Sequence, residues 1–370
     1  MKAQQRQILA IALAGAMTVS TVSAVMAAEA PAKLHVKFPD ARLTISGLPW
    51  FDEEKPELRR LPTRMKELFR PPVWALAQNP SGGRIRFRTD SGVVGIAAKN
   101  PDASSMHHMT KIGQSGFDLY VGNDYLGSAA PDKDGRIVKE WALGEAGVMR
   151  DITIYLPLYK NVTVEELTFD SKVKFEPAKP FAVKKPVVYY GSSITQGGCA
   201  SNPGMSYQAI LGRMTGSDFV NLGFSGNGLG DAPVALAMTE IDASCYVLDY
   251  WGNPTASQYM ATLPGFTDLL RKKYPKVPII IPGPFYFSAE SLGGDVARTQ
   301  MEKRKIARDF VEKRQKDGDL FISYVDGLEL LSREQTGGLV DGVHCNSLGF
   351  HFIARGLDPH LRRALGLPSK

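Results

Sequence analysis

The sequence contains few cysteines and no cysteine spacing typical of a metal site. Its 370 residues include three cysteines, Cys199, Cys245 and Cys345, and no C-x-x-C pair. We expect three small buried thiols, with a Cys199–Cys345 bridge as the alternative. The adjacent His107 and His108 would point to opposite faces of a strand, so we do not expect them to share a metal ion. A surface loop is the better interpretation for this pair.

Neither sign of charge is in large excess. The chain has 44 Lys and Arg against 38 Asp and Glu, a formal charge of +6. Several basic residues fall on one expected helix near 297–316, where a solvated helix face explains them better than a nucleic-acid surface. These residues are Arg298, Lys303, Arg304, Lys305 and Arg308. We therefore expect no nucleic-acid partner.

Outside the N-terminus the sequence lacks any run that is apolar and long enough to span a bilayer. Lys2 and Arg6 precede an apolar run at 8–25, which ends in small residues before Glu29. This pattern predicts a cleaved signal peptide at 1–28 and a secreted or periplasmic protein without stable membrane insertion. An uncleaved anchor is the alternative, but Ser, Thr and Gly dilute the run.

Residues 29–180 are rich in short β-type runs separated by turns. Alternating apolar and polar residues at 84–88, 93–97, 117–121 and 151–156 are typical of half-buried antiparallel strands. The pattern predicts an N-terminal β-sandwich domain of jelly-roll type. The proline-rich stretch 176–180 predicts its boundary.

Residues 181–370 alternate apolar strands with helices. Expected strands are 187–190, 219–222, 245–250, 278–281 and 320–325, and expected helices lie near 205–215, 257–273, 297–316 and 347–365. Such alternation predicts a parallel sheet covered on both faces, with reactive groups at the carboxyl ends of the strands.

A serine, a histidine and an aspartate are expected at that edge. Ser193 follows the first of these strands in a Gly-Ser-Ser turn, whereas Asp341 and His344 follow the last. A histidine activates a serine hydroxyl by taking its proton, and a carboxylate orients the imidazole. Ser192 is a rival nucleophile. The other interpretations are a turn residue for Ser193 and a backbone-satisfied helix-start histidine for His344.

Acyl transfer also needs hydrogen-bond donors for the developing oxyanion, each worth about 3 kcal/mol. The backbone N–H groups of Ser193 and Gly226 and the side chain of Asn253 are the candidates. Gly226 could instead only permit a turn, and Asn253 could cap one before Pro254.

Four segments together resemble the SGNH (GDSL-like) hydrolases. They are Gly-Ser-Ser-Ile-Thr at 191–195, Asn-Leu-Gly-Phe-Ser-Gly at 221–226, Gly252-Asn253, and Asp-Gly-Val-His at 341–344. The resemblance implies a flavodoxin-like three-layer α/β/α domain, with Ser193 as nucleophile, His344 as base and Asp341 as its partner. It also implies an oxyanion hole of Ser193, Gly226 and Asn253, and no metal or cofactor. The sequence departs from the family pattern in two places, since Ser192 replaces the usual Asp and Pro254 follows Asn253.

The sequence Gly-Phe-Asp-Leu-Tyr at 116–120 is similar to the Gly-x-Asp-Leu-Tyr signature of the β-domain found before one branch of these esterases. We expect Asp118 to be a structural hydrogen-bonding acid that helps seat that domain. Tyr250 and Trp251 are expected either to line a pocket or to pack in the core.

These observations predict a secreted serine esterase for small acyl groups, first of all acetyl, on a carbohydrate. A lipid or lysophospholipid esterase is the nearest rival. An acyltransferase with the same triad and a glycan-binding protein with a decayed hydrolase domain are the other hypotheses. The sequence leaves the oligomeric state open.

Overall fold

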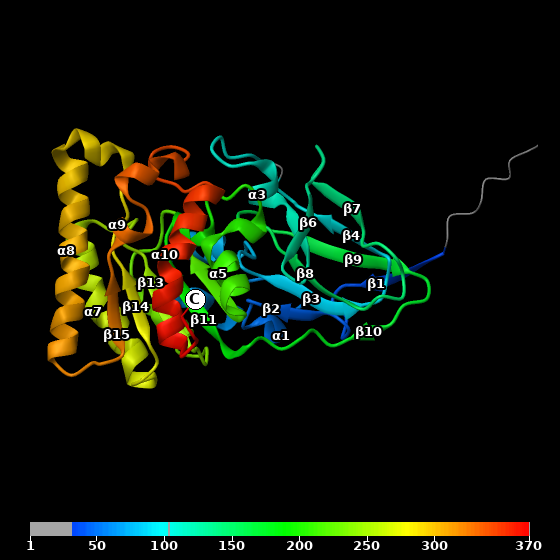
Figure 1. Ribbon diagram of the computed structural model, residues 1–370, viewed down its shortest axis with the longest axis horizontal. Helices are drawn as coiled ribbons and strands as arrows, with labels where there is room; N and C mark the ends of the chain where they lie inside the picture. Colours follow the sequence, from blue (N-terminus) through cyan, green and yellow to red (C-terminus); the bar gives the residue numbers. More distant parts are fainter. Residues whose placement is uncertain (1–31, 103, 370) are drawn as a thin grey trace, which may run out of the picture. The chain divides into compact units, whose positions relative to one another are not determined.

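The computed structural model describes residues 32–102 and 104–369. The predicted signal peptide lies outside the described residues. From Lys33 onward the chain forms one compact unit (Figure 1). No helix among the described residues combines the length and the apolar character needed to cross a membrane.

The first half of the described chain is a sandwich of two antiparallel sheets. One sheet has the strand order β1-β9-β4-β7, and the other has the order β10-β3-β8-β5-β6 with β2 paired to β3. The strands are β1 (Lys33–Lys37), β2 (Thr44–Ser46), β3 (Arg84–Thr89), β4 (Val93–Lys99), β5 (Phe117–Val121), β6 (Asp124–Ala129), β7 (Arg136–Ala142), β8 (Arg150–Tyr155), β9 (Thr163–Asp170) and β10 (Phe175–Glu176). Their inward side chains, such as Phe87, Ile96 and Phe169, form one apolar core. The predicted jelly-roll-like sandwich is confirmed.

The second half is built on a five-stranded parallel sheet. Its strand order is β12-β11-β13-β14-β15, the order of a flavodoxin-like fold. The strands are β11 (Val183–Gly191), β12 (Ser217–Gly223), β13 (Cys245–Asp249), β14 (Ile279–Pro282) and β15 (Ile322–Val325). Because both faces are covered, the buried part of the strands is mostly apolar, as predicted, for example 187–190 in β11 and 279–281 in β14.

Helices form the two outer layers of this half. Figure 1 shows α7 (Ala256–Lys273) and α8 (Gly294–Lys316) on one side of the sheet, and α5 (Tyr207–Thr215) and α10 (Ser347–Leu365) on the other. The helix α6 (Ala232–Met238) packs against α7 and was not predicted. Shorter helices are α1 (Phe51–Glu54), α2 (Pro71–Ala77), α3 (Lys111–Ser115), α4 (Ser193–Gln196) and α9 (Gly327–Leu330), and the 3₁₀ segments are Thr63–Leu68, Pro203–Met205, Ser288–Leu292 and Arg333–Gly338.

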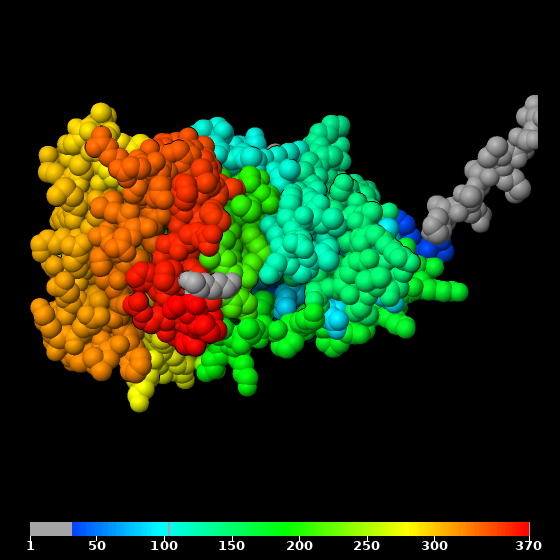
Figure 2. All heavy atoms as spheres, in the orientation of Figure 1, coloured from blue at the N-terminus to red at the C-terminus, as the bar shows by residue number. Residues whose placement is uncertain are grey.

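Apolar residues of the first half belong to the same core as the parallel sheet. Trp50, Tyr155 and Tyr159 are buried together with residues of β11 and β13. Figure 2 shows green atoms of the second half packed directly against cyan atoms of the first. The predicted division at residue 180 stays a prediction, because the contact pattern keeps both halves in one compact unit.

Buried polar residues also join the halves. Arg60, only 1% exposed, donates hydrogen bonds to the carbonyls of Asn221 and Gly223 at 3.1 and 2.5 Å. Burial lowers the pKa of Arg60 to about 9. Asp118 accepts hydrogen bonds from the backbone N–H of Gly204 at 2.7 Å and from the Asn202 side chain. The expectation that Asp118 seats the β-sandwich is therefore met by its contacts.

The basic helix α8 corrects one expectation. Lys303 and Arg304 are buried rather than solvated. The ammonium of Lys303 donates to the Trp251 carbonyl at 2.9 Å, and Arg304 pairs with Glu290 at 2.8 Å. These internal partners compensate for the burial of charge.

All three cysteines are free and buried, as expected. Burial raises the pKa of the Cys199 thiol to about 12, with a further contribution from the Asp341 charge. The thiols are therefore protonated at neutral pH.

Candidate active site

The turn after β11 presents Ser193 at the start of a short helix. Gly191 ends the strand, and a Cβ at this position would lie 1.9 Å from Thr195 Oγ1 and 2.5 Å from the Asp249 carbonyl oxygen. The Ser192 hydroxyl accepts a hydrogen bond from the Ile194 N–H, which makes Ser192 the N-cap of α4. The local geometry thus gives the two serines different environments.

Ser193, His344 and Asp341 form one hydrogen-bonded chain. Ser193 Oγ lies 2.9 Å from His344 Nε2, and His344 Nδ1 lies 2.8 Å from Asp341 Oδ2. Asp341 Oδ1 also accepts from the backbone N–H groups of Val343 and His344, at 3.0 and 2.8 Å. The structure brings together the three residues that the sequence predicted from opposite ends of the second half.

The Asp341 carboxylate is held in its ionised form. Partial burial would raise its pKa, but hydrogen bonds from the His344 backbone, the His344 ring and the Val343 backbone outweigh burial and lower the pKa to about 2. An ionised carboxylate next to Nδ1 fixes the proton of the neutral ring on that nitrogen. Nε2 is then the atom that can accept a proton from the Ser193 hydroxyl.

Two glycine-containing loops meet at the nucleophile turn. Cβ atoms built at Gly228 and Gly252 would lie 3.1 Å from Ser192 N and 3.0 Å from Ser192 Oγ. Gly226 has φ +67°, in the left-handed region that favours glycine. Asn253 Oδ1 accepts from the Gly228 N–H at 3.1 Å, which fixes the orientation of the Asn253 amide and leaves Nδ2 as its donor.

Residues of the first half form hydrogen bonds to the turn that carries Ser193. The Tyr159 hydroxyl donates to the Ser193 carbonyl at 3.0 Å. The Gln196 side chain donates to the Leu158 carbonyl at 3.1 Å and accepts from the Ser225 N–H at 2.9 Å. Tyr159 was not predicted to contact the turn, since no local pattern distinguishes it from other tyrosines that follow a strand.

Asp249 lies beneath the same turn, at the end of β13. Its Oδ2 accepts from the hydroxyls of Tyr207 and Thr195, at 2.9 and 3.2 Å, and its Oδ1 accepts from Trp251 Nε1 at 2.7 Å. Burial raises the pKa of Asp249 to about 6, although these hydrogen bonds partly oppose the shift. Tyr250 and Trp251 are buried, so core packing is the correct interpretation for both.

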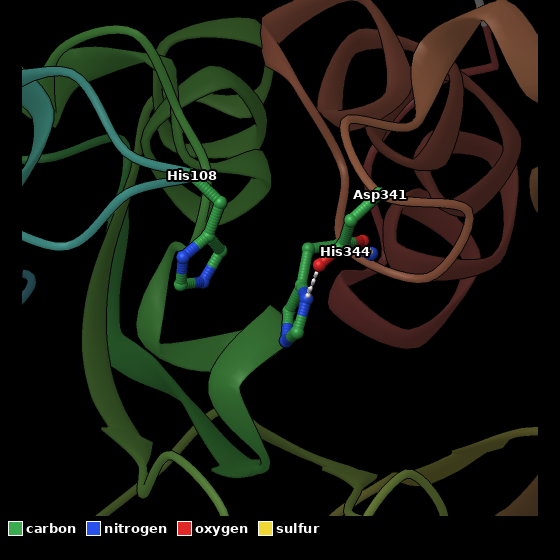
Figure 3. Close-up of side chains that lie close together, drawn as sticks. All are labelled: His108, Asp341 and His344. Carbon is green, nitrogen blue, oxygen red and sulfur yellow. Dashed lines mark hydrogen bonds and ion pairs between the residues drawn. The ribbon is translucent and has the colours of Figure 1, made fainter.

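One further residue of the first half was not predicted at the site. The His108 ring centroid lies 5.4 Å from that of His344, and both side chains project toward the same space (Figure 3). Burial lowers the pKa of His108, and the neighbouring histidines lower it further. His108 is half-buried in the loop between β4 and α3, whereas its neighbour His107 is exposed.

Together His108, Asp341 and His344 have ligand-type atoms within 4.8 Å of one another. Two histidines and a carboxylate at this spacing could hold a divalent ion. The hydrogen bonds among Ser193, His344 and Asp341 already account for two of the three side chains. We therefore interpret Asp341 and His344 as members of the hydrogen-bonded chain, with the His108 ring packed beside them.

An apolar cavity of about 350 Å³ lies beside the loop that carries Asp341 and His344. Phe287, Val296 and Val343 line it. The 3₁₀ segment Ser288–Leu292 is held to this loop by a 3.0 Å hydrogen bond from the Ser288 N–H to the Gly342 carbonyl. The cavity therefore borders the residue that precedes His344.

Two family profiles match the chain. Residues 184–362 match the GDSL-like lipase/acylhydrolase family, and residues 35–175 match the N-terminus of SGNH hydrolase-type esterases. No curated protein matches the chain in sequence.

Solved structures resemble nearly the whole chain. A protein from Bacteroides ovatus ATCC 8483, classed as a GDSL-like lipase, is 28% identical, with a TM-score of 0.83 over 92% of this chain and 100% of its own. The salicylyl-acyltransferase SsfX3 from a tetracycline biosynthetic pathway is 20% identical, with a TM-score of 0.76 over 90% of this chain and 98% of its own. A family two carbohydrate esterase from Clostridium thermocellum, in complex with cellohexaose, is 17% identical, with a TM-score of 0.56 over 77% of this chain and 93% of its own.

The family profiles fall on the two halves seen in the fold, and the 28% identical neighbour covers 92% of this chain. The chain is therefore a carboxylic ester hydrolase of the GDSL-like lipase/acylhydrolase family, with the GxDLY-type N-terminal region of the SGNH esterases.

Proposed function

We propose that this protein is a secreted or periplasmic serine esterase that removes small acyl groups, first of all acetyl, from a carbohydrate. The observation that carries the proposal is the hydrogen-bonded chain from Ser193 through His344 to Asp341, at the carboxyl edge of the parallel sheet. His344 Nε2, a proton acceptor, lies 2.9 Å from the Ser193 hydroxyl, and the ionised Asp341 carboxylate orients the His344 ring.

The first half-reaction forms an acyl-enzyme. His344 Nε2 takes the Ser193 proton as Ser193 Oγ bonds to the ester carbonyl carbon. The resulting imidazolium is stabilised by Asp341. When the tetrahedral intermediate collapses, the bond from carbon to the alcohol oxygen breaks and His344 gives its proton to that oxygen.

Water completes the reaction. His344, neutral again, takes a proton from a water molecule that attacks the acyl carbon. Collapse of the second intermediate returns the proton to Ser193 Oγ and releases the carboxylic acid. The steps consume one water for each ester and need no other reactant.

The oxyanion is assigned to three donors. They are the N–H of Ser193, the N–H of Gly226 and Asn253 Nδ2. The convergence of the loops that carry Gly226 and Asn253 at Ser192 supports this assignment, as does the Gly228 hydrogen bond that orients the Asn253 amide. Each donor would stabilise the transition state by about 3 kcal/mol.

A carbohydrate substrate is favoured by the proteins that share this fold. A family two carbohydrate esterase with bound cellohexaose has the same fold, and so has one from Cellvibrio japonicus. The predicted signal peptide at 1–28 agrees with a substrate outside the cytoplasm. Sequencing the N-terminus of the exported protein tests cleavage after residue 28.

The decisive experiment is hydrolysis of p-nitrophenyl acetate, butyrate and octanoate by the mature protein, by Ser193→Ala and by Ser192→Ala. Ser193→Ala should lower kcat by at least about 10⁴-fold. Ser192→Ala removes only a helix cap and should retain most of the activity. Loss of activity in Ser192→Ala alone would move the nucleophile, and equal activity in all three proteins would refute the mechanism.

The same assay tests a second candidate, an esterase for longer apolar groups. The apolar cavity beside Val343 favours it, since a cavity of about 350 Å³ has room for more than an acetyl group. Octanoate hydrolysed faster than acetate would support this candidate. If Val343→Asp weakened the preference for octanoate, the octanoyl group would be placed in the cavity. An added sugar acceptor with product analysis separates hydrolysis from acyl transfer.

A further inference from the structure

The loop that carries His108 is fixed in place by both halves of the chain. The buried Lys160 donates to Ser104 Oγ at 2.6 Å and also pairs with Asp102. At the end of the loop, Thr110 Oγ1 donates to the Ser201 carbonyl at 2.5 Å. His108 therefore reaches the site from an anchored loop of the first half, and its position does not depend on the second half alone.

The protein itself makes little use of the His108 ring. Its ring packs against His107, with 4.7 Å between centroids, and against His344. Its Nδ1 is buried and has no hydrogen-bond partner among the described residues. Most buried polar atoms in folded proteins have partners, so contacts within the fold do not account for this ring. Because Nδ1 is buried, Nε2 is the nitrogen of His108 that is left to meet a ligand.

The chemistry of the reaction says which part of the ester lies near His108. His344 returns its proton to the alcohol oxygen, so that oxygen must come within hydrogen-bond distance of Nε2. The His108 ring packs directly against the His344 ring. Atoms of the alcohol next to the ester oxygen therefore come within reach of His108, whereas the carbonyl oxygen turns toward the oxyanion donors.

We propose that His108 binds a hydroxyl of the alcohol part of the substrate, next to the ester oxygen, so that the site selects esters of a polyol such as a sugar. This inference rests on the proposed function and names the residue that would bind the alcohol part of the ester. A neutral imidazole both donates and accepts a hydrogen bond, as a hydroxyl does. The β-sandwich half would thereby contribute directly to substrate choice.

The test compares two acetate esters that differ in the hydroxyls of the alcohol. One is a mono-O-acetyl methyl xyloside, and the other is cyclohexyl acetate, whose ring carries no hydroxyl. We expect the ratio of kcat/KM for the sugar ester to that for cyclohexyl acetate to fall about tenfold in His108→Ala, the effect of one lost hydrogen bond. His108→Phe keeps a ring of similar size without nitrogens and should lower the ratio as well.

His107→Ala is the matched control, because His107 is the exposed neighbour of His108 and should leave the ratio unchanged. An unchanged ratio in a folded His108→Ala or His108→Phe protein would overturn the inference, whatever happens to the absolute rates. If the wild type hydrolyses p-nitrophenyl acetate and the ratio is unchanged, only this inference fails. If the wild type hydrolyses none of the three esters, the proposed function fails and the inference falls with it.

Discussion

Replacement of Asp118 by alanine should lower the free energy of unfolding by about 3 kcal/mol. The Asp118 carboxylate is completely buried and accepts three hydrogen bonds. Oδ1 accepts from Ser128 Oγ at 2.6 Å, and Oδ2 accepts from Asn202 Nδ2 at 2.6 Å and from the Gly204 N–H at 2.7 Å. The last two donors belong to the second half, so the substitution removes a link between the halves.

The magnitude follows from the burial of each donor. The Gly204 N–H is buried, and an unsatisfied buried donor costs about 2 kcal/mol. Asn202 is half-buried, so water can replace the carboxylate and the loss is about 1 kcal/mol. The Ser128 hydroxyl lies 2.7 Å from the Tyr125 hydroxyl and can turn to it, so it adds little.

Asp118→Asn is the matched control because the amide has the shape of the carboxylate. Its oxygen can face the Gly204 N–H and the Asn202 amide, while its NH₂ group donates to Ser128 Oγ. Burial raises the pKa of Asp118 despite these hydrogen bonds, so a neutral side chain also avoids burying a charge. We expect Asp118→Asn to stay within about 1 kcal/mol of the wild type.

The assay is guanidinium unfolding at pH 7, followed by tryptophan fluorescence, with comparison of the extrapolated free energies and of the m-values. Equal losses in Asp118→Ala and Asp118→Asn would refute the hydrogen-bond argument. A loss below 1 kcal/mol in Asp118→Ala would show that water satisfies the buried donors.

Three further predictions concern the site. Asp341→Asn should lower kcat about 10⁴-fold with little change in KM, because an amide NH₂ facing His344 Nδ1 favours the wrong tautomer; a loss below tenfold would mean that other contacts orient His344. Tyr159→Phe should cost about 1 kcal/mol of stability and only a few-fold in kcat, because the Ser193 carbonyl keeps the N–H donors of residues 197 and 198; a hundredfold loss of kcat would contradict this. Because the pKa of Asp249 is raised to about 6, its contribution to stability should be complete below about pH 4 and decline by about 3 kcal/mol as pH rises through 6. Denaturant unfolding at pH 4.5 and 7.5 checks this decline in the free energy of unfolding. In Asp249→Asn the part of the pH dependence that comes from Asp249 should disappear.

The sequence predicted the parallel sheet well because buried strands are continuously apolar. The run at 187–190 lies inside β11, and the run at 278–281 overlaps β14. Once these strands are recognised as parallel, their carboxyl ends must share one edge. This topology explains why Ser193 and His344, which are 151 residues apart, were predicted to meet.

The contributions of the first half to the site were not predicted. Tyr159 and His108 act through contacts with distant residues, and neither periodicity nor spacing records such contacts.

The charge pattern of α8 was also misleading. A basic residue is exposed by default, but Lys303 finds a backbone carbonyl and Arg304 finds Glu290 inside the fold.

The connecting segment 177–182 runs along the surface, with Pro177 and Lys179 exposed. The two halves are nevertheless held together by a common apolar core and by Arg60, neither of which lies in this segment. A protease that nicked the chain here would leave two fragments that stay associated, with the Tyr159 hydroxyl still under Ser193. We therefore expect the assembled enzyme not to need the covalent connection, although Lys179 and Ala182 bind this segment to Arg86 and Gly216.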